Sequence, residues 1–147
     1  NGCLVGSEMC IRDSIYGSPK YLEKHGFPKS TSDLNKHSFI SFGRGAPSPV
    51  YNPDWALKLG TKDNKKRKTV MKVNSVYGLL LAVQSGVGLA ALPDYITVNQ
   101  PNIVKVLPNI EGPITEAHFV YPQSMKNVAR VQAFRNFLYS KISEWEF

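Results

Sequence analysis

Cysteine is scarce in this 147-residue chain, and its two cysteines, Cys3 and Cys10, both lie within the first ten residues. The sequence also has no His-x-x-x-His or Cys-x-x-Cys pair, the spacings that commonly bind a metal ion. Disulfides, a metal site and a cofactor are therefore not predicted. The lack of cysteine in residues 15–147 fits a cytoplasmic protein, because stable disulfides are rare in that compartment.

Long apolar runs are absent as well. No run approaches the roughly 20 residues that a membrane-spanning helix needs, so an integral membrane protein is excluded as a reading of this sequence. The hydrophobic content of 42% and the charged content of 20% are ordinary for a globular protein. A chain of this length suits a single domain.

Groups that could catalyse a reaction do not gather in any pattern. The three histidines, His25, His37 and His118, fall in a predicted helix end, a loop and a strand, with no shared spacing. Catalysis needs groups that converge on one point. The Gly86-Val87-Gly88 segment follows a predicted helix instead of opening one, so it is not a phosphate-binding loop. We therefore expect that the chain is not an enzyme.

Acidic residues are fewer than basic ones, 11 against 18, and the formal net charge is +7. Much of the excess lies in residues 62–68. A short charged run is usually a solvated loop, which is the interpretation we favour; contact with a DNA backbone is the functional alternative. The run contains no aromatic residues, so it would be a poor platform for single-stranded nucleic acid.

The first 14 residues differ in character from the rest. Residues 3–14 resemble the in-frame translation of a transposon-type sequencing-library adapter. We therefore expect residues 1–14 to be an artefact without biological meaning, and we leave them out of the fold prediction. The alternative is a genuine N-terminal segment with a strand at residues 3–5.

Residues 73–93 carry the strongest structural pattern. A short extended run ends at residue 73, and Asn74 or Ser75 can then cap a helix by accepting a backbone N–H of its first turn. Apolar residues follow at the spacing of one helix face (Val76, Leu79, Leu80 and Val83). Gly86 suits the left-handed position after a helix, and residues 89–92 with Pro93 predict a buried parallel strand. The unit is a strand–helix–strand crossover of an α/β sheet.

The remaining elements follow from local signals. Ser18 and Pro19 open a helix over residues 19–25, Thr31 or Ser32 caps a short turn at 33–34, and residues 39–42 form a strand. Glycine and proline punctuation predicts a loop at 43–54. Alternation predicts a strand at 55–59, so that residues 60–68 form the polar tip of a hairpin leading to the strand at 69–73.

The C-terminal third is predicted in the same way. We expect a short helix at 94–98, strands at 103–107 and 115–121, and a last helix at 127–145. This helix has an apolar stripe that must be buried against something (Val128, Val131, Phe134, Leu138 and Ile142, with Phe137 beside it). If nothing covers the stripe, the chain should expose an apolar patch around Phe134 and Leu138 and associate.

Four segments in order resemble the effector-binding domain of bacterial LysR-type transcriptional regulators: residues 18–28, 33–42, 73–93, and 120–122 with the helix containing Ala133-Phe134. The resemblance implies an α/β, type 2 periplasmic-binding-protein-like fold, mainly the second subdomain with the hinge strands and the C-terminal helix. Residues 15–117 would form subdomain II with the first hinge crossing. Residues 118–147 would form the return crossing and the C-terminal helix of a truncated subdomain I.

The resemblance also implies partners. The family binds a small, often anionic or aromatic effector between two subdomains, and binds DNA through an N-terminal winged helix-turn-helix that this sequence does not contain. The full-length protein is expected to be a cytoplasmic homodimer or homotetramer, of which this chain would be a fragment. The identity of the effector, and activation as opposed to repression, do not follow from the sequence.

The candidate binding residues follow from the strand ends. Ligands of α/β sheets bind beyond the carboxyl ends of the strands, and a helix N-terminus there suits an anion. Asn74 and Ser75 could bind the effector, or could be caps only. The other candidates are Phe42 and Gly43, which could instead be a core residue and a turn glycine, and Ser18, Leu92 and Pro93.

Two further functions remain open. The chain could be one lobe of a periplasmic solute-binding protein that serves a transporter, because the folds are related. It could also be a free-standing basic protein that binds nucleic acid through residues 62–68. The spacing within residues 18–28 and 73–93 favours the regulator.

Overall fold

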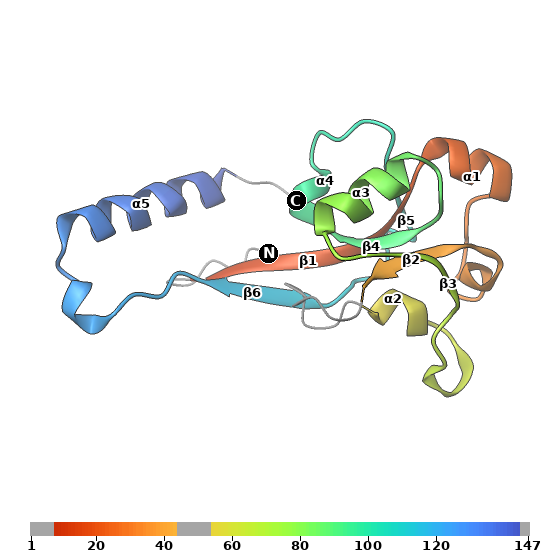
Figure 1. The fold of residues 1–147 in the computed structure, drawn as a ribbon, viewed down its shortest axis with the longest axis horizontal. Helices are drawn as coiled ribbons and strands as arrows, with labels where there is room; N and C mark the ends of the chain where they lie inside the picture. The colour runs from red at the N-terminus through yellow and green to blue at the C-terminus, as the bar shows by residue number, and fades with distance from the viewer. Residues whose placement is uncertain (1–7, 44–53, 145–147) are drawn as a thin grey trace. The chain divides into compact units, whose positions relative to one another are not determined.

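The computed structural model describes residues 8–43 and 54–144. Its elements are, in chain order, β1 (Glu8–Gly17), α1 (Pro19–His25), η1 (Asp33–Lys36), β2 (Phe39–Phe42), α2 (Trp55–Lys58), η2 (Lys62–Asn64), β3 (Thr69–Val73), α3 (Val76–Gln84), β4 (Ala90–Pro93), α4 (Asp94–Thr97), β5 (Val104–Val106), β6 (Ile114–His118), η3 (Gln123–Met125) and α5 (Ala129–Ser143). Figure 1 shows them along the ribbon. The chain divides into two compact units, residues 12–114 and residues 1–11 with 115–147.

The strands of residues 12–114 follow one spatial order, β3-β2-β4-β1-β5. Strands β2 and β3 are parallel, with Phe42 opposite Val73. Strand β1 is antiparallel to both β4 and β5, with Ile15 opposite Ala91 and Val106. A parallel bridge between Phe39 and Leu89, at the start of β4, connects the two sets of strands. Strands β2, β3 and β4 therefore run in one direction, as the crossover prediction requires.

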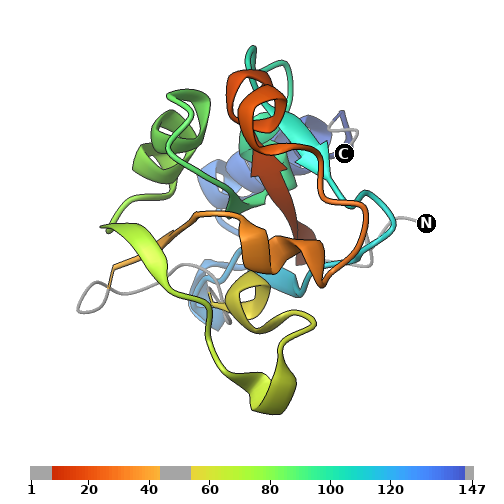
Figure 2. The same cartoon turned by 90° about the vertical axis from the view of Figure 1, so that its right-hand side faces the viewer.

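The sheet is covered on both faces. Successive strand residues point to opposite sides, and the buried residues separate accordingly. One core cluster joins the strands to α1 and α2 (Ile15, Phe39, Leu89, Tyr21, Leu22, Leu34, Trp55, Ala56, Leu57 and Val106). The other joins them to α3 (Tyr16, Ile40, Ala90, Leu92, Leu79, Leu80 and Val83). Figures 1 and 2 show α2 and α3 on opposite sides of β2, which makes this an α/β layered fold.

The crossover predicted for residues 73–93 is confirmed. Ser75 is the N-cap of α3, and its Oγ accepts a hydrogen bond from the Gly78 N–H at 3.3 Å. Gly86 follows the helix with a φ of +80°, the left-handed conformation that its lack of a side chain permits. Strand β4 is buried and ends at Pro93 as expected, although its longer pairing is with antiparallel β1.

The strand predicted at residues 55–59 is wrong: this segment begins with the helix α2. Trp55, Ala56 and Leu57 are all buried, and three consecutive residues cannot share one face of a strand. A helical turn buries them together and is closed by a hydrogen bond from Leu59 N to Trp55 O at 3.1 Å. The predicted hairpin is therefore absent, and the basic run is not a hairpin tip.

Smaller differences concern caps and ends. Helix α1 matches the prediction, but the turn at η1 is not capped by the Ser32 side chain; instead Asp33 Oδ2 accepts the N–H groups of Lys29 and Ser30. Residues 8–14, which we left out of the prediction, form the larger part of β1. The strand considered at residues 3–5 and most of the loop predicted at 43–54 lie outside the described residues.

The second unit contains β6 and α5. Strand β6 pairs with β1, whose residues 8–11 belong to this unit, and it ends at His118, earlier than predicted. Helix α5 occupies most of its predicted range, but none of its residues is buried. Phe134 and Phe137 are 52% and 54% exposed. Among the residues that the structure describes, no helix has the length and apolar character to span a membrane.

Candidate functional site

The ends of three strands meet along one edge of the sheet. Because β2, β3 and β4 run in the same direction, their carboxyl ends lie at one edge, where β2 ends with Phe42 and β4 with Leu92-Pro93. Gly43 directly follows β2, and Asn74-Ser75 directly follow β3. The Gly43 N–H donates to Val73 O at 2.8 Å, and a methyl group added at Gly43 would lie 3.7 Å from the Asn74 Cβ. The structure thus brings together six of the seven residues predicted for the binding site.

The most accessible part of this edge is the start of α3. Asn74 and Ser75 are exposed, and the Asn74 amide makes no hydrogen bond with any described residue. The first N–H groups of a helix have no acceptor within the helix, and at α3 the Ser75 Oγ satisfies the one at Gly78. The remaining first-turn amides and the Asn74 amide are hydrogen-bond donors with no acceptor among the described residues, and they lie at the positive end of the helix dipole.

The other four residues of the edge are less accessible. Leu92 and Pro93 are buried, so their side chains belong to the core beneath the edge. Phe42 is half-buried and packs against the core cluster that includes Leu80 and Val83. Gly43 is also half-buried, beside Asn74. All four residues lie beneath or beside Asn74 and Ser75. Of the four, only Phe42 and Gly43 are partly accessible to a ligand.

Ser18 is not part of this arrangement. It follows the carboxyl end of β1, which is antiparallel to β4, so it lies at the opposite edge of the sheet. Its side chain is buried, and its Oγ accepts the Tyr21 N–H at 3.3 Å. The hydroxyl therefore caps α1, the role that its position before Pro19 also predicts.

Beside the end of β4 lies a buried polar group that the sequence prediction missed. Tyr16 Oη donates to Asp94 Oδ1 at 3.0 Å, and Lys105 Nζ donates to Asp94 Oδ2 at 3.2 Å. Burial raises the pKa of Tyr16 to about 12, and the negative charge of Asp94 adds to this effect. The phenol therefore stays protonated and keeps donating to Asp94, which ties β1 to the residue after β4.

Asp13 is the second polar residue that the prediction missed. It lies opposite Pro93 on β1 and is 2% exposed. Burial, strengthened by the charge of Asp94, raises the pKa of Asp13 to about 6. The Trp55 indole is close enough to lower this pKa somewhat, but neither Asp13 Oδ1 nor Trp55 Nε1 has a hydrogen-bond partner of good geometry in the described part of the chain.

Metal binding has no support in the described residues, where no group of three or more His, Cys, Asp and Glu side chains is placed to hold an ion. The strand ends have a different chemical character. It offers amide donors and a positive dipole end, with apolar residues beneath.

Known proteins resemble the chain in fold and in sequence. The regulatory domain of CrgA, a LysR-type transcriptional regulator from Neisseria meningitidis, superposes with a TM-score of 0.70 at 22% identity, over 93% of this chain and 67% of that one. This likeness shows an α/β fold of the type 2 periplasmic-binding-protein class.

Two curated sequences are also similar. An uncharacterized HTH-type transcriptional regulator of Haemophilus influenzae is 31% identical over 109 residues, which are 71% of this chain and 36% of that protein. The regulator YhjC of Escherichia coli K12 is 26% identical over 132 residues, 87% of this chain and 44% of that protein. The chain thus spans less than half the length of these two relatives.

The family assignment comes from the profile of the LysR substrate binding domain, which matches residues 14–142, nearly the whole described chain. The four segments that resemble the family in sequence all lie within this match. Because this profile covers most of the sequence, the chain belongs to the LysR substrate-binding domain family.

Proposed function

We propose that this chain is the ligand-sensing part of a LysR-type transcriptional regulator and that a small carboxylate effector binds at the start of α3. The observation that carries the proposal is the exposed pair Asn74 and Ser75 at the shared edge of β2, β3 and β4. Phe42 and Gly43 would line the same site, with Leu92 and Pro93 supporting it from the core. Ser18, at the opposite edge, would act only through α1.

The chemistry favours an anion. A carboxylate at the end of α3 would accept the unpaired first-turn N–H groups and the Asn74 amide, and would meet the positive end of the helix dipole. The dipole alone contributes about 0.3–1 kcal/mol, so these groups give weak affinity by themselves. We infer that the rest of the regulator supplies further contacts to the effector.

The partners belong to the whole regulator. We propose a cytoplasmic homodimer or homotetramer that binds DNA through a winged helix-turn-helix and in which the effector changes the relative populations of two conformations. The family match and the two similar regulators support this reading. They do not favour the lobe of a periplasmic solute-binding protein, and the family they indicate is one of regulators and not of enzymes.

Amide chemical shifts test the site directly. We expect benzoate and acetate, titrated into the ¹⁵N-labelled chain, to shift the amides of Asn74, Val76 and Tyr77, while neutral benzamide and acetamide do not. The Ser75→Asp variant is the decisive control. Aspartate also caps helices, so α3 should persist, but its negative charge should abolish the carboxylate-dependent shifts. Shifts that are unchanged in Ser75→Asp, or spread evenly over the surface, would overturn the proposal.

A further inference from the structure

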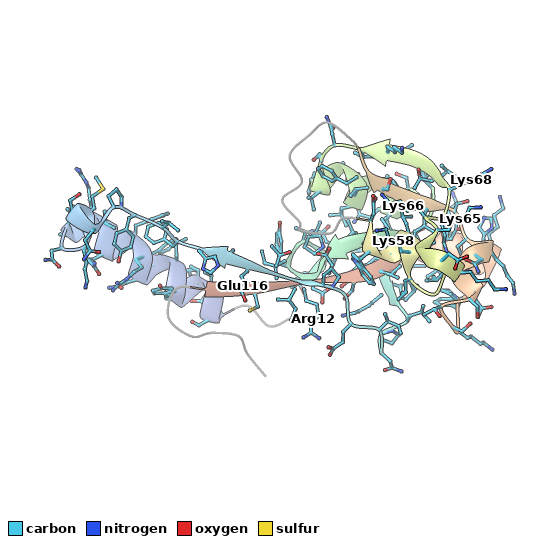
Figure 3. All side chains as sticks on the ribbon, turned by 90° about the horizontal axis from the view of Figure 1, so that it is seen from below. Arg12, Lys58, Lys65, Lys66, Lys68 and Glu116 are labelled. Atoms are coloured by element: carbon cyan, nitrogen blue, oxygen red, sulfur yellow. The ribbon has the colours of Figure 1, made fainter. Side chains whose placement is uncertain are left out.

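The segment after α2 carries a concentration of positive charge. Lys58, Lys62, Lys65 and Lys68 have no hydrogen bond or ion pair with any described residue, and we call these four side chains the lysine face. Figure 3 shows Lys58, Lys65, Lys66 and Lys68 gathered on the α2 side of the sheet. The side chains of Lys62, Lys65 and Lys68 are exposed and that of Lys58 is half-exposed.

Arg67 fixes the backbone of this segment. Its guanidinium donates to Asn35 Oδ1 at 2.8 Å, to Ala56 O at 3.1 Å and to Thr31 O at 3.0 Å. Its backbone N–H donates to Leu57 O at 2.9 Å, and its guanidinium lies over the Phe39 ring at 5.7 Å. These contacts attach the segment to η1, α2 and β2, and they fix the backbone next to Lys66 and Lys68.

Acidic residues compensate little of this charge. Lys66 Nζ lies 2.5 Å from Asp54 Oδ2, so the charge of this lysine is already paired with a carboxylate. Asp63 is the one acid within residues 58–68, against six basic residues. The lysine face thus remains strongly positive, and neutralising it with an external polyanion would relieve the mutual repulsion of its ammonium groups.

We propose that the lysine face binds the phosphate backbone of duplex DNA. Lysine is a point-charge phosphate ligand, and residues 58–68 contain no aromatic side chain on which unpaired bases could stack. Duplex DNA is the polyanion that a member of a transcriptional-regulator family meets. This contact would be independent of the effector site and in addition to any DNA-binding domain of the full-length protein.

The salt dependence of binding tests the proposal. We expect the chain to bind a fluorescent 20-base-pair duplex of arbitrary sequence at low salt, measured by anisotropy. Each phosphate contact contributes about −0.9 to the slope of log K against log salt, so neutralising four contacts should reduce the slope by roughly 3 to 4. The variant carries Lys58→Gln, Lys62→Gln, Lys65→Gln and Lys68→Gln.

The matched control removes the same charge elsewhere. Lys20→Gln, Lys24→Gln, Lys126→Gln and Arg130→Gln change four exposed residues and should leave the slope within about one unit of the original. Equal losses in the two variants, or no salt-dependent binding at all, would overturn the proposal. So would equal or tighter binding of a single strand or of heparin.

Folding of the variants is checked by thermal melting. If the quadruple lysine variant does not fold, the pair Lys65→Gln and Lys68→Gln should still reduce the slope by about 2, compared with Lys20→Gln and Lys24→Gln. If Lys65→Gln with Lys68→Gln left the slope unchanged, the proposal would be contradicted, just as it would be by an unchanged slope in the quadruple variant.

Discussion

At the scale of single residues, Asp13 is a buried carboxyl group of which one oxygen has no hydrogen-bond partner in the described part of the chain. A buried carboxylate with no donor on one oxygen is costly, because neither water nor the protein solvates its charge. The origin of residues 1–14 in a library adapter stays a proposal, which sequencing the source DNA would test.

The pKa of Asp13 predicts how stability changes with pH. Its value in the folded chain, about 6, is above the ordinary 3.8, so the unfolded chain loses the proton first as pH rises. The contribution of Asp13 to the free energy of unfolding should therefore be largest below pH 4, fall between about pH 4 and 6, and then stay level. The total loss from this group is about 2 to 3 kcal/mol.

The Asp13→Asn variant isolates this effect. Urea unfolding at pH 7 should show it to be about 2 kcal/mol more stable than the original chain, with the difference shrinking toward pH 4. Glu23→Gln, an exposed acid on α1, should change stability by less than about 0.5 kcal/mol at either pH. A constant difference between Asp13→Asn and the original chain across this range would contradict the assignment.

At the scale of secondary structure, the cap of α3 holds the edge that we assign to the effector. Ser75→Ala removes the acceptor for the Gly78 N–H and should reduce stability by about 1 kcal/mol in urea unfolding. Ser85→Ala is the control at the other end of the same helix, where the exposed hydroxyl only donates back to Leu81 O, and it should cost less than about 0.5 kcal/mol. Equal costs would mean that the Ser75 cap contributes nothing particular.

The elements that the sequence predicted well are those whose local signals agree. In α3 the cap at Ser75, the apolar face and the left-handed Gly86 all specify one helix. Helix α1 is bounded by Ser18-Pro19 and Gly26 in the same way. In α2 the signals conflict, because Lys58 between two leucines suggests a strand while burial of Ala56 requires a turn of helix. In such short segments, tertiary packing determines whether a helix or a strand forms.

The site was predictable only in part, for a related reason. Strand ends and helix caps are local features, so the sequence could predict that Asn74, Ser75, Phe42 and Gly43 lie at the ends of strands; their role in binding stays a proposal. The hydrogen bond between Tyr16 and Asp94 joins residues 78 positions apart, and no local pattern reveals it. Asp13 was missed because residues 1–14 were left out of the prediction. Ser18 was placed wrongly because its position at the far edge follows from the antiparallel direction of β1, which the sequence did not reveal.

At the scale of the whole molecule, no residue of α5 is fully buried, and the aromatic part of its apolar stripe is exposed. Phe134 and Phe137 are both more than half exposed, and the Phe119 ring, 5.5 Å from that of Phe134, extends the apolar surface. Exposed patches of this kind promote association. We expect light scattering of the chain at about 100 μM to give a mass well above the 16.4 kDa of one chain.

Matched variants test which exposed apolar surface causes the association. Phe134→Ser with Phe137→Ser should restore the mass of one chain, whereas Phe27→Ser, which removes an aromatic ring exposed to a similar degree on the other unit, should not. A single-chain mass for the original protein would contradict the expectation.

The bridge between Phe39 and Leu89 has a consequence for how a ligand could act. Two hydrogen bonds, from Ile40 N to Leu89 O at 2.8 Å and from Leu89 N to Ser38 O at 2.9 Å, join the β2–β3 pair to the strands on its other side. Helix α3 begins after Asn74 and packs against strands on both sides of these two hydrogen bonds, through Ile40 of β2 and through Ala90 and Leu92 of β4. A ligand that stabilised the start of α3 would therefore hold the two sets of strands together, and would slow the exchange of the Ile40 and Leu89 amide protons with solvent.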